Sequence, residues 1–163
     1  MKTSEMRTKC KKISVDFHGV INFDPVLFGA MMRLWHDKGI KIYVVSGGPH
    51  EYIAAYLQKH NIPYDNLWCI FDYFNSREKI TVAADGSFHI DDELWNAAKG
   101  KFCAAEKIDL HIDDSNVYGK YFSTPYVQFD GKKRCFYTDT TCIYIKDIKT
   151  TAANLCRCCS KVD

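Results

Sequence analysis

Three short, mainly apolar segments of this chain each end in a polar residue, and this pattern constrains the fold most. Residues 13–15 lead into Asp16, residues 43–45 into Ser46, and residues 110–112 into Asp113 and Asp114. Such runs are typical of buried parallel strands, whose carboxyl ends meet at one edge of a sheet, where ligands bind. Because a buried carboxylate is costly without a partner, we expect these strand ends to form one site.

Helix signals between these segments complete a β-α-β-α-β alternation. Asp24 and Pro25 form a helix start and Gly39 a helix end, while a second helix begins at Pro49 and ends near Asn61. Further predictions are strands at 40–45, 67–71, 108–112 and 126–129, and a helix from Asp91 or Asp92 to about Lys107. This order predicts an α/β fold, a Rossmann-like three-layer sandwich with a mainly parallel central sheet.

Two regions depart from that alternation. Asp85-Gly86, between β-prone flanks, predicts a small β-hairpin near residues 80–90. Residues 135–146 are rich in Thr, Tyr and Ile and predict an edge strand, and the last dozen residues predict a helix or a loose tail.

Length and composition favour one globular domain. The 163 residues are 47% hydrophobic and 26% charged, with a core over about 12–130 and a cysteine-rich extension over 131–163. No apolar run could span a bilayer and the first residues do not resemble a signal peptide, so we expect a cytoplasmic protein without membrane contact. In that setting we expect no disulfide framework, and Cys10, Cys69 and Cys103 read as small buried hydrophobic residues.

Charge is concentrated at the two ends. Residues 1–12 carry five Lys/Arg against one Glu, and residues 131–163 carry seven against three Asp, within a net charge of +2. We prefer solvated basic tails, with a basic rim that attracts a phosphorylated substrate as the alternative. The near-neutral total argues against nucleic-acid binding, and a nucleic-acid module using the basic ends is a third, less favoured hypothesis.

The ordered motifs resemble those of the haloacid dehalogenase-like superfamily of phosphohydrolases. The first motif, an apolar strand ending in D-x-D-G-[TV], corresponds to residues 16–20 (Asp-Phe-His-Gly-Val), and the second, a strand ending in Ser or Thr, to Ser46-Gly47. A lysine and then a strand ending in Asp113-Asp114 complete the set. The resemblance covers about residues 12–130 and implies a fold of that superfamily without a full cap domain.

The resemblance also implies a chemistry. Asp16 would attack phosphorus and form an aspartyl-phosphate, while Ser46, the Gly47 amide and a lysine would hold the phosphate. Mg²⁺ would bind Asp16, the backbone carbonyl of His18 and Asp114, with Asp113 more remote from the ion. These roles describe a magnesium-dependent phosphomonoester hydrolase.

The motif lysine has two candidates. Lys99 lies fifteen residues before Asp114, and Lys101 would point to another side of the same predicted helix. We choose Lys99. Too few residues separate the motifs for a helical cap, so the 80–90 hairpin is at most a small flap. An open site suits a bulky phosphorylated substrate or closure by an oligomeric partner, and the oligomeric state stays open.

His18 is the departure from the family pattern. It replaces the second aspartate, which protonates the leaving group and then activates water. Histidine can do acid–base chemistry, but a poorly placed one would give a slow enzyme. The alternative is a catalytically inactive domain that binds a phosphorylated ligand or partner.

Overall fold

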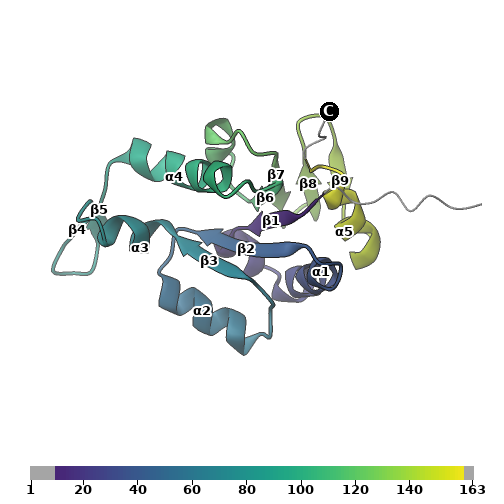
Figure 1. The fold of residues 1–163 in the computed structure, drawn as a ribbon, viewed down its shortest axis with the longest axis horizontal. Helices are drawn as coiled ribbons and strands as arrows, with labels where there is room; N and C mark the ends of the chain where they lie inside the picture. Colours follow the sequence, from purple (N-terminus) through teal and green to yellow (C-terminus); the bar gives the residue numbers. More distant parts are fainter. Residues whose placement is uncertain (1–9, 160–163) are drawn as a thin grey trace, which may run out of the picture.

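The computed structural model describes residues 10–159, which form a mixed α/β fold around a seven-stranded sheet (Figure 1). The strand order is β3-β2-β1-β6-β7-β8-β9, and the first five strands are parallel. The strands of the sheet are β1 (Lys12–Val15), β2 (Lys41–Ser46), β3 (Asn66–Cys69), β6 (Leu110–Asp113), β7 (Tyr126–Asp130), β8 (Cys135–Tyr137) and β9 (Cys142–Tyr144).

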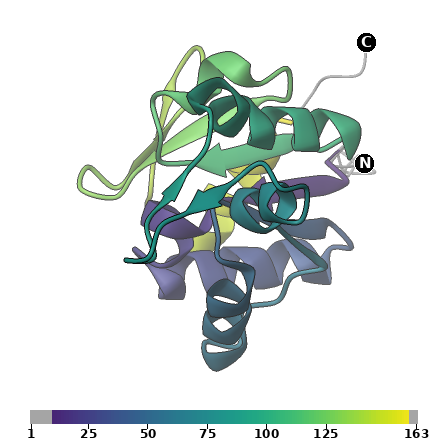
Figure 2. The same ribbon diagram turned by 90° about the vertical axis from the view of Figure 1, so that its left-hand side faces the viewer.

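Helices cover both faces of the sheet. One face packs against α1, α2 and α5 in the main hydrophobic core, and the other packs against α4 in a smaller one (Figures 1 and 2). The helices are α1 (Pro25–Asp37), α2 (His50–Lys59), α3 (Ile70–Asn75), α4 (Asp92–Ala105) and α5 (Ile148–Cys156). This arrangement confirms the predicted α/β class and the mainly parallel sheet. No helix in residues 10–159 is both long enough and apolar enough to cross a membrane.

Side-chain caps confirm two of the predicted helix starts, whereas α2 begins after Pro49 without such a cap. Asp24 accepts from the Leu27 amide at 3.0 Å, and Asp91 accepts from the Leu94 amide at 3.0 Å. Each cap satisfies an amide that has no partner inside the helix, so the chain turns at these aspartates.

The predicted hairpin is confirmed as β4 (Thr81–Val82) paired with β5 (Phe88–His89). Figure 1 shows β1 and β2 pointing toward the side on which this hairpin lies, and Figure 2 views the molecule from that side. The hairpin therefore stands beside the carboxyl ends of the parallel strands.

Two sequence predictions about the sheet were inaccurate. The strand predicted at 67–71 ends at Cys69, and the apolar run continues as α3. Short apolar runs fit a buried strand and a buried helix equally, so periodicity alone misplaces this boundary. The single edge strand predicted over 135–146 is two antiparallel strands, β8 and β9.

The C-terminal segment is integrated into the domain. Its strands extend the sheet, and the Trp35 indole N–H donates to the Ala152 carbonyl of α5 at 3.1 Å. A disulfide joins Cys10 to Cys159, so the expectation of no disulfide was wrong for this pair. The two cysteines are 149 residues apart, and no local spacing signals their pairing.

Candidate active site

The site lies at the carboxyl ends of β1 and β6, the two adjacent strands at which the strand order of the sheet reverses. From β1 the chain builds β2 and β3 on one side, and then crosses to place β6 on the other side of β1. Such a switch point opens a crevice at the carboxyl ends of the two adjacent strands, where ligands bind in open α/β sheets. Here β1 runs into Asp16, and β6 ends in Asp113 followed by Asp114.

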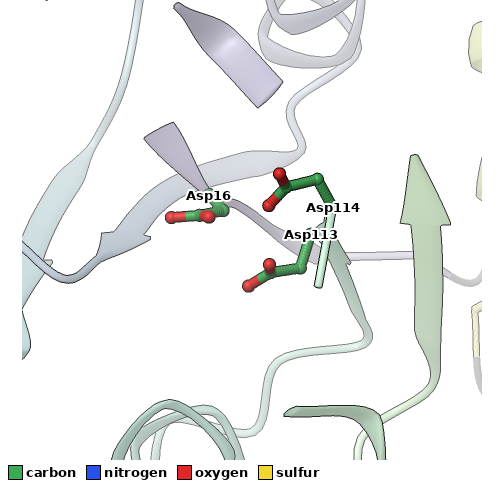
Figure 3. Close-up of side chains that lie close together, drawn as sticks. All are labelled: Asp16, Asp113 and Asp114. Carbon is green, nitrogen blue, oxygen red and sulfur yellow. The ribbon is translucent and has the colours of Figure 1, made fainter. Parts of the chain in front are cut away.

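These three aspartates form what we call the acidic cluster. Each offers a carboxylate oxygen, and the three oxygens lie within 4.8 Å of one another, as Figure 3 illustrates. Asp16 and Asp113 are buried, whereas Asp114 is exposed. The structure therefore brings together the acids that the sequence placed at separate strand ends.

Lys99 supplies the positive charge of the cluster from α4. Its ammonium lies 3.0 Å from Asp16 Oδ1 and 2.7 Å from Asp113 Oδ2, and the residue is 3% exposed. Lys101, the alternative, is exposed and lies outside the cluster. Burial opposes the charge on Lys99, but the two carboxylates outweigh it and raise the pKa of the ammonium.

The hydrogen bonds of the two buried aspartates differ. Asp16 Oδ1 accepts from the Phe17 amide at 2.8 Å as well as contacting Lys99, which leaves Oδ2 for another partner. Asp113 accepts from Lys99, from the His111 ring and from the Ser115 amide. Asp113 is thus an anchored carboxylate, whereas Asp16 keeps one oxygen without a hydrogen-bond partner among residues 10–159.

The ionisation of the cluster follows from these contacts. Burial raises the pKa of Asp16 despite the opposing charge of Lys99. Burial works against ionised Asp113 too, but the hydrogen bond from His111 and the charge of Lys99 prevail and hold its pKa below the usual range. Burial and the neighbouring Asp113 raise the pKa of Asp114. One lysine does not balance the charge of three ionised acids, so the cluster offers net negative charge to a cation.

A hard divalent cation fits the donor set. Mg²⁺ takes oxygen ligands at about 2.0–2.1 Å in octahedral geometry, so two of its ligands lie at most about 4.2 Å apart. The carboxylate oxygens, within 4.8 Å of one another, need to move inward by only a few tenths of an ångström to share one such ion. Gly19 makes room for this arrangement, because a Cβ there would collide with the carboxylate of Asp114. Its φ of 75° also favours glycine.

His18 lies beside the cluster on the turn that follows β1. Its Nε2–H donates to the Gly48 carbonyl at 3.0 Å, since a carbonyl can only accept. In the neutral ring this leaves Nδ1 with a free lone pair. The histidine is exposed and is available for proton transfer.

Ser46 and Gly47 lie at the end of β2, the strand next to β1. The Ser46 hydroxyl is fully buried and has no hydrogen-bond partner among residues 10–159. Within the same residues no hydrogen bond joins Ser46 to the acidic cluster, so the structure places these residues near the site without linking them to it.

His111 is a residue beside the acidic cluster that sequence reasoning did not place there. It is fully buried. Its Nδ1 forms a hydrogen bond with the Ser14 hydroxyl at 2.7 Å, and its Nε2 contacts Asp113 Oδ2 at 3.0 Å. A buried chain of polar groups thus runs from Ser14 through His111 and Asp113 to Lys99. The available signal was spacing, because positions 111 and 113 share one face of a strand.

The chain matches no protein-family model, no curated protein and no solved structure. The fold and the arrangement of the site therefore carry the functional argument.

Proposed function

We propose that this protein is a magnesium-dependent phosphomonoester hydrolase of the haloacid dehalogenase-like type. The observation that carries the proposal is the placement of Asp16, a buried carboxylate held at 3.0 Å by Lys99 with one oxygen spare, at the switch point beside Asp114. Phosphoryl transfer needs a nucleophile, fixed positive charge and a cation site, and these groups supply all three.

The reaction has two steps. Asp16 Oδ2 attacks phosphorus and the bond from phosphorus to the leaving oxygen breaks, while that oxygen takes the Nδ1 proton of a doubly protonated His18, which leaves the ring neutral. Water then attacks the phosphorus of the aspartyl-phosphate, gives a proton to His18, and releases inorganic phosphate and the free carboxylate. Lys99 holds the Asp16 carboxylate in place and offsets charge throughout.

Asp16, Asp114 and the His18 carbonyl would hold Mg²⁺, which when bound offsets the negative charge of the phosphate. Asp113, whose oxygens already accept three hydrogen bonds, serves instead to fix Lys99. The unpaired Ser46 hydroxyl and the Gly47 amide remain the proposed phosphate donors.

A second function, phosphate-ligand binding without turnover, is favoured by one observation. His18 stands where the family has a carboxylate, and its ring is tied to the Gly48 carbonyl. Loss of general acid–base catalysis costs about 10²–10⁴-fold in rate.

Release of phosphate from 4-nitrophenyl phosphate separates the two functions. The wild-type chain with Mg²⁺ should exceed both its EDTA-treated form and Asp16→Asn, while Asp37→Asn, an exposed aspartate of α1, serves as the matched control. Equal rates for wild type and Asp16→Asn would refute hydrolysis through Asp16. Retained phosphate binding by calorimetry would then support the binding domain.

A further inference from the structure

An apolar pocket adjoins the site on the side of His18. It has a volume of about 350 Å³ and is formed by the β1 turn, the loop after β2, and aromatic residues of α3, the hairpin and α4. The lining residues are His18, Gly47, Gly48, Pro49, Phe71, Gly86, Phe88 and Trp95. This volume lies at the low end of the roughly 300–1,000 Å³ of small-molecule sites.

Three aromatic rings form its walls. Phe88 lies edge-to-face with Phe71 at a centroid distance of 5.0 Å and 5.5 Å from the Trp95 ring. Trp95 in turn lies against the loop after β2, since a Cβ on Gly47 would come within 3.2 Å of its ring. The walls therefore meet the backbone proposed to hold the phosphate.

The hairpin leaves an aromatic side chain partly exposed at this place, beyond its contacts with Phe71 and Trp95. Phe88 is 45% exposed, although it sits on a two-residue strand that could carry a polar residue. Of the described residues that line the pocket, His18 is the one with a titratable side chain. A sugar or a further phosphate would find few polar partners there, whereas a flat ring would find three aromatic surfaces.

We propose that this pocket receives the leaving group and selects phosphomonoesters whose alcohol carries a planar aromatic ring. The inference rests on the proposed hydrolysis and names its substrate class. The scissile oxygen would lie between Asp16 and the pocket, with His18 at their boundary. The hairpin then acts as a wall for the substrate, in place of a cap domain.

The test compares three substrates that all leave as primary alcohols: benzyl, cyclohexylmethyl and ethyl phosphate. Aromatic walls hold an aromatic ring more strongly than a saturated one, so kcat/KM for benzyl phosphate should exceed both others by roughly tenfold. Phe88→Ala should lower the benzyl-to-cyclohexylmethyl ratio severalfold, because only Phe71 and Trp95 then remain as aromatic walls. Val82→Ala is the control, because Val82 pairs with Phe88 in the hairpin and is exposed outside the pocket.

Equal kcat/KM for benzyl and cyclohexylmethyl phosphate would overturn the aromatic assignment, as would a ratio that Phe88→Ala leaves unchanged. If no substrate turns over above Asp16→Asn, the proposed hydrolysis fails, and calorimetry with benzylphosphonate and ethylphosphonate in Mg²⁺ decides on the pocket. Tighter benzylphosphonate binding that Phe88→Ala weakens supports the pocket. Equal affinities for the two phosphonates overturn it.

Discussion

Replacing Lys99 with methionine should destabilise the fold strongly, because it removes the positive charge that pairs with two buried carboxylates. Methionine keeps a long side chain, so the loss of charge is the main change. The ammonium lies 3.0 Å from Asp16 and 2.7 Å from Asp113, and all three groups are buried. Breaking a buried ion pair costs about 3–5 kcal/mol. For a chain of 163 residues, at about 2–4 °C per kcal/mol, Tm should fall by roughly 10 °C. Urea unfolding and thermal melts at pH 7 measure both quantities.

The same substitution should have a pH signature. Burial already raises the pKa of Asp16, and loss of Lys99 raises it further. A raised pKa means that the folded state takes up the proton first, so the stability deficit of Lys99→Met should shrink as pH falls from 7 toward the unfolded pKa of 3.8. Lys101→Met, an exposed lysine on the same helix, should change stability by less than about 0.5 kcal/mol. Equal effects of the two variants would refute the charge argument.

Three further outcomes are expected. The pKa of Asp113 is lowered, because hydrogen bonding and the charge of Lys99 outweigh the opposing effect of burial. The stabilisation that ionised Asp113 provides is present above the unfolded-state pKa of 3.8 and is lost as pH falls through the lower pKa of the folded state. Asp113→Asn should therefore flatten the acid side of a plot of urea midpoint against pH. Gly19→Ala should abolish the rise of Tm with Mg²⁺, because the added Cβ would collide with the carboxylate of Asp114. Gly39→Ala is the control, since Gly39 has a φ of 80° but nothing lies within 4 Å of the added Cβ. This variant should lose only about 1–2 kcal/mol of stability to backbone strain and keep the Mg²⁺ response. Reduction of the Cys10–Cys159 disulfide should cost about 2–4 kcal/mol in urea unfolding, and Cys10→Ser should remove this sensitivity to reductant.

The strand ends were predictable because their signal is local. An apolar run followed by Asp16 or by Asp113 and Asp114 is visible within a few residues, and parallel strands must bring such ends to one edge. Helix starts at Asp24 and Asp91 were readable for the same reason, since a cap acts on an amide three residues away.

The rest depends on contacts between distant segments. The register that sets Ser14 opposite His111 follows from β6 lying beside β1, which no local pattern reveals. Strand β3 gives way to helix α3 where the Phe71 amide donates to the Gly47 carbonyl at 2.9 Å. Gly47 lies in a loop more than twenty residues earlier in the chain. The aromatic pocket likewise joins residues from five separate segments.

The position of β6 beside β1 has a consequence for how the chain acquires its structure. A nascent chain that has completed β3 already contains Asp16 but not its lysine, which follows on α4. Until α4 docks, the unit from β1 to β3 must keep that aspartate hydrated or protonated. The N-terminal half therefore lacks the positive charge that pairs with Asp16, and the crossover that brings Lys99 to this carboxylate also adds β6 beside β1.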